Sequence, residues 1–372
     1  MGRKNKSRLI PMEEVKISKD FTNRDWVELR RQLVLDENWE TAFRVFNDRV
    51  QTRFLTPIEK IKGIEKNEGQ GFSITLISVA LLEHLAALES GKIYKVSRPG
   101  SRRELSPIEY SVSAGLFNSF LKKATLFKES FSDGSRKNFY DNIRCGLVHE
   151  ARTLGNDIII SDTSEKNERK GELYFKIGNQ FRLNRDELLR KIQEHVSQMR
   201  SRLLDKNDQL LKRNFILKFD EISGLKHDWY FIYGSNLNES QINERLLKHG
   251  NCYLGKERCQ LKEYKFVYNK KSIDGTAKAN LVKFEGGVVE GVAICVEKTA
   301  LGEFLKEFET GYDVVEVDLW IGESSFKAVT CISHDFIEVG PSEDYVNKIL
   351  IGAEENDLPE EYINEFLRPK NV

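Results

Sequence analysis

The stretch YFIYGSNLNE, Tyr230 to Glu239, is an apolar strand pattern that stops at Gly-Ser-Asn just before the chain turns helical. A tight turn between a strand and a helix offers consecutive backbone N–H groups, and such turns bind anions or developing oxyanions. Gly234 permits a positive φ or the close approach of a ligand, while Ser235 and Asn236 add side-chain donors. The same pattern is also typical of an ordinary strand-to-helix turn with Asn236 or Asn238 as the N-cap.

The rest of this half of the chain alternates β-type runs with shorter helical patterns. The strand candidates are WYFIY, CQLKEYKFVY, KANLVKF, VVEGVAICV, YDVVEVDLWI and FKAVTCIS, and the helix candidates are residues 239–249, 298–308, 342–353 and 359–366. Several antiparallel strands with helices on one side predict an α+β domain. We expect it to be built on a curled mixed sheet or a small barrel.

The first half of the chain is mainly helical from residue 21 to residue 204. FSITLISVALLEHLAALESG, Phe72 to Gly91, is apolar nearly all round and ends in glycine, which predicts a buried central helix with its C-cap. Shorter helical runs follow at 111–123 and 136–148. DIIIS and ELYFKIG then predict a small β hairpin across the polar loop SEKNERKG. Asn184 is the predicted N-cap of the last helix of this half.

At 372 residues, the chain is long enough for two or three domains of ordinary size. We predict a basic, flexible N-terminus (1–20), a helical domain (21–204), a linker (205–226) and the α+β domain (227–372). The linker is placed where the pattern loosens into charged residues, although FILKF, Phe215 to Phe219, suits a helical turn or a short strand.

Composition limits the partners and the compartment. The 58 basic and 58 acidic residues cancel, so any nucleic-acid or membrane partner would need a local patch of charge. No run of about 18 uninterrupted apolar residues occurs, and we expect a soluble, cytoplasmic protein with no membrane partner. Five cysteines without a CxxC pair argue against a disulfide framework and a zinc site. We therefore expect neither a metal nor a cofactor.

Several ordered segments of the second half together resemble the γ-glutamylcyclotransferase family, with its AIG2-like and BtrG-like members. The match runs from Trp229 to about Leu367. Its segments are YGSNL (233–237), KANLV (278–282), VVEGVAICV (288–296), LKEFETGYDVVEV (305–317), PSEDY (341–345) and YVNKILIGAEENDLPEEY (345–362). The resemblance implies the fold of that family for this half of the chain.

The resemblance also implies a reaction. In this family the α-amine of a γ-glutamyl substrate attacks its own γ-carbonyl, which releases the γ-linked amine and forms 5-oxoproline. Holding the substrate folded removes much of the entropic barrier to closing the five-membered ring. The ammonium must lose a proton before it attacks, and charge that develops on the carbonyl oxygen must be stabilised. The expected partner is a small γ-glutamyl amine, peptide or modified amino acid.

A carboxylate meets the first need if its surroundings raise its pKa towards the working pH. The family places its catalytic glutamate as the last acid of an LDxxEG-like run, and LKEFET puts Glu309 at that position. Lys306 stands where the family has an acid, and Thr310 stands where it has glycine. Without the resemblance, Glu307 and Glu309 suit solvated charges at the end of a helix.

The resemblance assigns substrate binding to the turn and to two tyrosines. The turn residues are Tyr233, Gly234, Ser235, Asn236 and Leu237. Their N–H groups would hold the substrate's α-carboxylate or the developing oxyanion. Tyr312 and Tyr345 match family tyrosines that line the pocket, and half-buried structural aromatics are the alternative interpretation. His334 stands where cyclotransferases commonly carry tyrosine, so it either tunes substrate choice or lies at the surface.

A second resemblance lies in the helical half, at FYDNIRCGLVHEA, Phe139 to Ala151. Arg144 and His149 have the R-x4-H spacing of the HEPN superfamily, many members of which are metal-independent RNases that use a homodimer. The resemblance implies that His149 exchanges a proton at the ribose or the leaving oxygen and that Arg144 neutralises the phosphate of a bound RNA.

Two features bear on this HEPN-like site. Positions five apart lie ~140° apart around a regular helix, so either the helix ends near Gly146 or two Arg144/His149 pairs meet across a homodimer. Cys145 stands where active members usually carry a polar residue such as Asn or Asp, which lowers the expectation of RNase activity. The alternative is that Arg144 and His149 secure the helix to the hairpin that follows.

Three functions therefore stay open. The first is a cyclotransferase with Glu309 as the general base. The second is an HEPN RNase or toxin-like effector, suited to phage defence or a stress response, whose activity the cyclotransferase-like half controls. The third is a non-catalytic protein that dimerises or binds a ligand.

Overall fold

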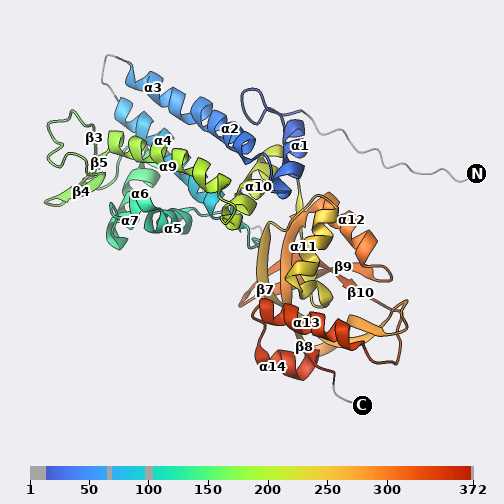
Figure 1. Cartoon of the computed structure of the whole chain (residues 1–372). Helices are drawn as coiled ribbons and strands as arrows, with labels where there is room; N and C mark the ends of the chain where they lie inside the picture. The colour runs from blue at the N-terminus through green and yellow to red at the C-terminus, as the bar shows by residue number, and fades with distance from the viewer. Residues whose placement is uncertain (1–13, 65–68, 97–103, 370–372) are drawn as a thin grey trace, which may run out of the picture.

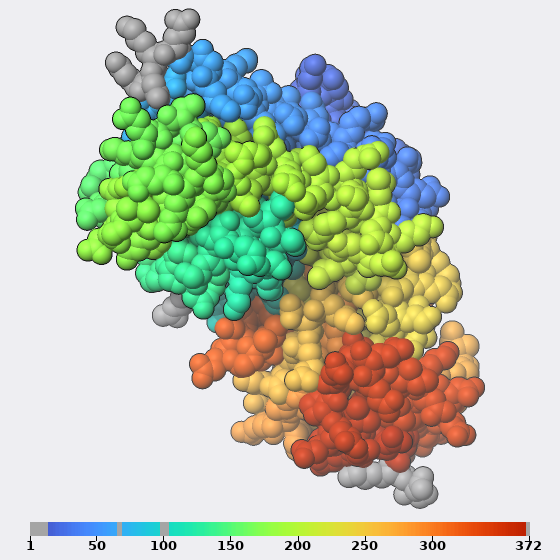
Figure 2. All heavy atoms as spheres, turned by 60° about the vertical axis from the view of Figure 1, so that its left-hand side comes forward, coloured from blue at the N-terminus to red at the C-terminus, as the bar shows by residue number. Residues whose placement is uncertain are grey.

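The computed structural model describes residues 14–64, 69–96 and 104–369, which form a helical half and a barrel half (Figure 1). The helices, in blue to green, gather at one end of the molecule, and the barrel and its helices, in gold to red, lie at the other. Figure 2 shows them as two adjoining lobes. Buried apolar side chains form two clusters, one mainly in each half.

The helical half consists of helices with two small sheets. Its elements are α1 (Asn23–Val34), α2 (Trp39–Val50), η1 (Gln51–Leu55), α3 (Thr56–Lys62), α4 (Gln70–Glu89), β1 (Ile93–Tyr94), β2 (Glu109–Tyr110), α5 (Ala114–Lys123), α6 (Thr125–Lys128), α7 (Asp133–Asn138), η2 (Phe139–Cys145), α8 (Gly146–Glu150), β3 (Ile158–Ile160), β4 (Tyr174–Ile177), β5 (Gln180–Asn184), α9 (Arg185–Leu204) and α10 (Gln209–Ser223).

Helix α4 is the central helix of this half, as the apolar run predicts. Leu82 and Leu85 are fully buried, and α3, α5, α9 and α10 contact the helix. Gly91, with φ +59°, follows its end. Among the described residues, α4 is the one helix long and apolar enough to cross a membrane, but 56% of that stretch is buried inside the protein. We therefore assign it to the helical core.

The segment 205–226, predicted to be a linker, instead contains α10. Phe215 and Phe219 are fully buried and stack with their ring centroids 4.6 Å apart, and Trp26 of α1 packs against both rings. Charged residues interleave with these buried positions in KRNFILKFDE. Because of these charges, the sequence pattern did not indicate the amphipathic helix α10, whose apolar face completes the helical core.

The predicted flexible N-terminus is only partly described, since residues 1–13 lie outside the described residues. In the remainder, Lys16 pairs with Thr22 in an isolated β-bridge, and Ile17 is 1% exposed within the helical core. Residues 14–20 are therefore packed against this half, and the prediction of flexibility was wrong for them.

The small sheet before α9 has a different pairing from the predicted hairpin. ELYFKIG provides β4, which pairs antiparallel with the following strand β5, whereas β3 of DIIIS pairs parallel with β5. The two-residue connection between β4 and β5 contains Gly178 with φ +57°, which suits a tight hairpin. The N-cap prediction is confirmed, because the Asn184 side chain accepts from the N–H groups of Asp186 and Glu187.

The barrel half combines five strands with helices. Its elements are β6 (His227–Ile232), η3 (Ser235–Leu237), α11 (Glu239–Lys248), β7 (Gly255–Lys271), β8 (Ala277–Glu297), α12 (Lys298–Phe308), β9 (Asp313–Ile321), β10 (Ser324–Ile332), α13 (Glu343–Glu355), α14 (Glu360–Tyr362) and η4 (Ile363–Leu367). The strands close into a barrel in the order β10-β6-β8-β7-β9, with β6 and β10 parallel and the other pairs antiparallel. The small-barrel alternative is thus confirmed.

KANLVKF and VVEGVAICV, predicted as two strands, belong to the single strand β8. The register between β7 and β8 shifts at Glu263, whose φ is +64°. A Cβ atom on Gly287 would lie 2.5 Å from the Tyr264 carbonyl oxygen. Gly286 and Gly287, which lie between the two predicted segments, therefore let the strand continue through an irregular, closely packed bend.

Helix α13 packs directly on the turn that follows β6, and Gly352 makes this contact. A Cβ atom there would lie 2.2 Å from the Asn238 nitrogen and 2.3 Å from the Leu237 carbonyl carbon. Because both are backbone atoms, we expect Gly352→Ala to lower the free energy of unfolding by about 1–3 kcal/mol, measured by urea denaturation.

The matched control is Gly302→Ala. Gly302 lies in α12, and a Cβ atom there meets nothing within 4 Å. Alanine is the better helix former by roughly 0.8–1.0 kcal/mol, so this variant should be neutral or more stable. Equal stability of the two variants would contradict the close contact at Gly352.

Two contacts from a buried ion pair of the helical half reach the barrel half. Asp220 of α10 is fully buried and accepts from Arg30 Nε of α1 at 2.8 Å and from Trp26 Nε1 at 2.8 Å. His227, the first residue of β6, lies with its Nε2 3.1 Å from the same carboxylate. Arg30 also donates to the side chain of Asn251, between α11 and β7, at 3.0 Å. The pair thus links β6 to α10 and the segment before β7 to α1.

Candidate active site

The YGSNL segment ends β6 and forms the short 3-10 helix η3. Gly234 has φ −113°, so close packing and not a positive φ accounts for glycine. A Cβ atom there would lie 3.2 Å from the Ala279 Cβ and 3.4 Å from the Tyr345 hydroxyl. The Leu237 N–H donates to the Gly234 carbonyl, and the Leu237 side chain is buried in the barrel core. Leu237 therefore stands apart from the pocket that the rest of the turn lines.

The structure brings Glu309 to this turn. Glu309 directly follows α12, and its Oε1 accepts from Asn236 Nδ2 at 2.7 Å and from the Tyr230 hydroxyl at 3.0 Å. Asn236 is buried. The carboxylate and the turn thus meet although more than seventy positions separate them in the chain.

Burial raises the pKa of the Glu309 carboxyl above its ordinary value. The Tyr230 hydrogen bond, the charge of Arg245, the Asn236 hydrogen bond and the charge of Lys270 act in the opposite direction without cancelling the effect. A carboxyl with a raised pKa can take up a proton near the working pH, as a general base must.

The three predicted tyrosines lie at the same pocket with different hydrogen bonds. Tyr345 accepts from the Ala279 N–H at 3.1 Å, so its own proton is available to a ligand, and burial raises its pKa to about 12. Tyr312 donates to the Ala279 carbonyl at 2.7 Å, and Tyr233 donates to the Cys331 carbonyl. Tyr345 is therefore the tyrosine best suited to donate to a substrate.

Thr310 and His334, two residues that depart from the family pattern, are both exposed. Thr310 is exposed, and Gly311 beside it has φ +77°. The left-handed residue that the loop needs is thus supplied one position later than in the family pattern. The His334 side chain is 75% exposed and lies 3.9 Å from the Asp313 carboxylate. His334 is therefore a surface residue.

Several site residues were missed by the motif reasoning. Tyr230, Ile232, Ala279 and Cys331 complete the pocket lining. Tyr230 and Ile232 lie two positions apart on one face of β6, so the strand period would have linked these two residues to each other but not to the predicted turn. Burial raises the pKa of the Cys331 thiol, which argues against a thiolate nucleophile. In the described part of the chain, no cluster of three or more His, Cys, Asp or Glu side chains could hold a metal ion.

The pocket between the turn and Glu309 is narrow, with a volume of about 30 Å³. This volume is far below the ≈ 300–1,000 Å³ of pockets that enclose a drug-sized ligand. A glutamyl group would therefore enter only if neighbouring side chains move.

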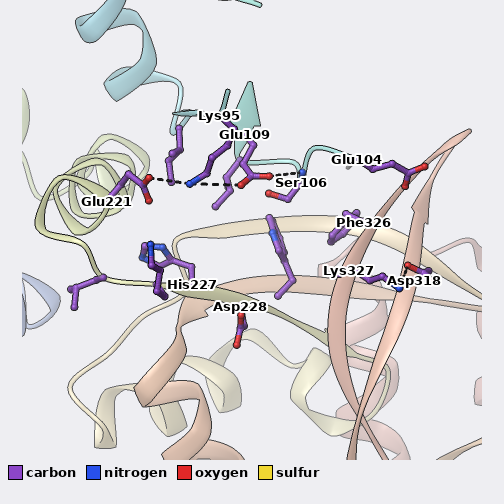
Figure 3. Close-up of a pocket in the computed structure, with 15 residues that line it drawn as sticks. Lys95, Glu104, Ser106, Glu109, Glu221, His227, Asp228, Asp318, Phe326 and Lys327 are labelled. Atoms are coloured by element: carbon purple, nitrogen blue, oxygen red, sulfur yellow. Dashed lines mark hydrogen bonds and ion pairs between the residues drawn. The ribbon is translucent and has the colours of Figure 1, made fainter. Parts of the chain in front are cut away.

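A larger hollow, of about 630 Å³, lies where the two halves meet (Figure 3). Figure 3 shows Lys95 between Glu109 and Glu221, and Lys327 beside Asp318. Lys95 Nζ lies 3.0 Å from Glu221 and 3.9 Å from Glu109, and Lys327 Nζ lies 2.8 Å from Asp318. These charged groups of the hollow are engaged in ion pairs with one another, whereas Glu309 lies at the turn and has a raised pKa. We therefore place the candidate active site at Glu309.

The R-x4-H residues lie apart from this site. The helix does not end near Gly146: η2 passes directly into α8. Arg144 is half-buried and donates to Glu83 of α4 at 2.7 Å, whereas His149 is exposed on α8. In this arrangement Arg144 secures the segment to the central helix, and an RNA phosphate would have to compete with Glu83 for it.

No protein-family model and no curated protein matches the chain. Several solved structures are similar to part of it. A structure described as a γ-glutamyl cyclotransferase is 24% identical and covers 40% of this chain and 91% of its own length, with a TM-score of 0.35. An uncharacterized human protein, loc79017, is 24% identical over 39% and 90%, with a TM-score of 0.34. YkqA from Bacillus subtilis is 23% identical over 41% and 59%, with a TM-score of 0.33.

Each of these likenesses covers about two fifths of this chain.

Proposed function

We propose that the barrel half is a γ-glutamylcyclotransferase-like enzyme that releases an amine from a γ-glutamyl compound and forms 5-oxoproline. The observation that carries the proposal is the position of Glu309. Its carboxylate lies 2.7 Å from Asn236 Nδ2, at the turn that would hold the substrate, and has a raised pKa. The ordered motifs of the sequence support the same reaction.

The proposed reaction needs one base and one stabilised oxygen. Glu309 takes a proton from the α-ammonium of the substrate, and the freed amine attacks the γ-carbonyl carbon. A new C–N bond closes the five-membered ring, and charge on the carbonyl oxygen is stabilised by donors of the turn or by the Tyr345 hydroxyl. The bond to the γ-linked nitrogen then breaks as the proton on Glu309 passes to the departing amine. The ring nitrogen loses its second proton, which the departing amine takes up to leave as an ammonium ion. Atoms balance without water or a co-reactant.

The direct test is the appearance of 5-oxoproline when the full chain is incubated with γ-glutamyl compounds. The substrates are a γ-glutamyl amino acid, a γ-glutamyl tripeptide and a γ-glutamyl alkylamine. Their α-glutamyl isomers are the controls, because attack of the α-amine on the γ-carboxyl would not release the linked amine or free 5-oxoproline. Product above the uncatalysed rate with at least one γ-glutamyl compound supports the proposal. No product from any of them would refute it.

The proposed base predicts the pH dependence of the reaction. Glu309 acts only when it is ionised, so kcat should rise with pH through a pKa above the ordinary value of a glutamate, ≈ 4.3. The measurement is the rate of 5-oxoproline release from pH 4 upwards at saturating substrate. A rate independent of pH across this range, with the protein folded throughout, would contradict a base with a raised pKa.

The RNase hypothesis for the helical half stays a prediction, as do the homodimer, the cytoplasmic location and the control of one half by the other. Cleavage of single-stranded RNA by the full chain, lost in His149→Ala, would support the RNase. The pairing of Arg144 with Glu83 favours a structural role for that arginine.

A further inference from the structure

Helix α11 lies outside the pocket and contacts both sides of the candidate site. Arg245 NH1 donates to Asn236 Oδ1 at 2.7 Å. The Arg245 guanidinium also stacks over the Phe308 ring, with its Cζ 4.9 Å from the centroid, and Phe308 directly precedes Glu309. Gln241, one turn earlier on α11, donates to Ser235 Oγ at 3.1 Å and to Asn236 Oδ1 at 3.3 Å. The same helix therefore contacts the substrate turn and the segment that carries the acid.

The Arg245 contact fixes the direction of the Asn236 amide. An amide can turn over and exchange its oxygen and its nitrogen, but arginine has only donors. The oxygen of Asn236 must therefore face Arg245, which leaves its Nδ2 to donate to Glu309. Gln241 donates to the same oxygen over a longer distance, 3.3 Å, so Arg245 is the closer and charged one of the two donors. Without Arg245, Gln241 alone would oppose a turn of the amide oxygen towards the carboxylate, a contact that would disfavour the ionised acid.

We propose, on the basis of the proposed function, that Arg245 is a positioning residue of the reaction, which acts on Glu309 through the Asn236 amide. Arg245 does not belong to the residues that line the pocket, and its guanidinium contacts Asn236 and Phe308 instead. Its removal should therefore impair the proton transfer more than the binding of substrate. In kinetic terms, kcat falls while KM changes little.

The charged and titratable groups around Glu309 come from several elements. They are Tyr230 from β6, Tyr233 just after β6, Arg245 from α11, Lys270 from β7, Tyr312 after α12, Cys331 from β10 and Tyr345 from α13. Arg245 and Lys270 are the cations among them. Loss of Arg245 removes one of two positive charges and the orientation of one hydrogen bond, and both losses favour the protonated acid.

The matched control is Lys248, which lies on the same helix. Lys248 Nζ also lies over the Phe308 ring, 5.5 Å from its centroid, and the lysine is exposed and pairs with Glu244 at 3.6 Å. Lys248→Met removes a cation from Phe308 and leaves the Asn236 contact intact. Arg245→Lys keeps the charge and one donor, so it should restore a large part of what Arg245→Met loses.

We expect Arg245→Met to lower kcat by about 10- to 100-fold, to leave KM within about twofold, and to move the acid limb of the pH–rate profile upwards. Lys248→Met should match the wild type in all three. In an Asn236→Ala background, Arg245→Met should lower kcat by a smaller factor than it does in the wild type, because only the direct effect of its charge on Glu309 remains.

A second measurement does not depend on activity. Carboxyl ¹³C NMR of Glu309 reports its titration in the full chain, and Arg245→Met should raise its midpoint whereas Lys248→Met should not. If the wild type forms no 5-oxoproline, the proposed function is refuted. The titration of Glu309 still shows whether Arg245 acts on this carboxyl. An unchanged Glu309 midpoint in Arg245→Met, or equal effects of Arg245→Met and Lys248→Met, would overturn the inference. If Arg245→Met does not fold, Arg245→Lys and Asn236→Ala give the same comparison.

Discussion

Replacing Glu309 with glutamine is expected to lower the rate of 5-oxoproline release by about 10²- to 10⁴-fold, the usual contribution of a positioned general base. Glutamine keeps an oxygen that can accept from Asn236 and Tyr230, so the geometry of the site is retained while the base is lost. The measurement is kcat with the best γ-glutamyl substrate at the pH of maximal activity. Activity within a few-fold of the wild type would show that another group takes the proton.

A companion measurement separates lost chemistry from lost folding. Because the folded-state pKa of Glu309 is raised, ionisation of this residue opposes folding at pH values above that pKa. Glu309→Gln removes this effect, so its thermal midpoint at neutral pH should equal or exceed that of the wild type. Glu307→Gln is the matched control. Glu307 is exposed and lies near His249 on the surface, with its carboxylate 3.3 Å from the His249 ring, so this change should leave both rate and midpoint unaltered.

The sequence predicts those residues of the candidate site that belong to motifs. It does not predict the residues that reach the site only through three-dimensional contacts. Glu309 and the 233–236 turn were placed by ordered segments, and the structure brings them together. Tyr230 and Arg245 belong to none of these ordered segments. Gln241 and Arg245 share a face of α11 because they are four residues apart, but a helix period does not reveal that this face meets Asn236. That contact depends on how α11 packs on the turn.

The fold was predictable where local patterns are strong. The apolar run of α4 and the Asn184 N-cap identify their helices, since burial and capping act on a few neighbouring residues. The small sheet and α10 were misjudged for a different reason. β3 pairs in parallel with β5, and the paired residues, such as Ile158 and Arg182, lie far apart in the sequence. The apolar face of α10 is defined by packing on Trp26.

The largest effect on stability is expected at the junction of the two halves. Asp220→Asn leaves the Arg30 guanidinium buried without its carboxylate, since the two side chains are 0% and 6% exposed. Removal of one partner of a buried ion pair typically costs about 3–5 kcal/mol. We expect a loss of that size in the free energy of unfolding at pH 7, measured by urea denaturation. Asp228→Asn, which removes an exposed pair with Lys298 (3.1 Å), should cost less than about 1 kcal/mol.

The pH dependence of this loss distinguishes the ion pair from a packing defect. Burial alone would raise the pKa of Asp220, but Arg30 and His227 hold it below its ordinary value. A carboxyl with a depressed folded-state pKa stabilises the fold above its unfolded-state pKa, ≈ 3.9, and this contribution disappears as the pH falls through the folded-state value. The difference in stability between wild type and Asp220→Asn should therefore be constant near neutral pH and shrink below about pH 4. A difference that persists undiminished in acid would mean that the asparagine disturbs packing, and that the charge of Asp220 does not hold β6 to the helical half.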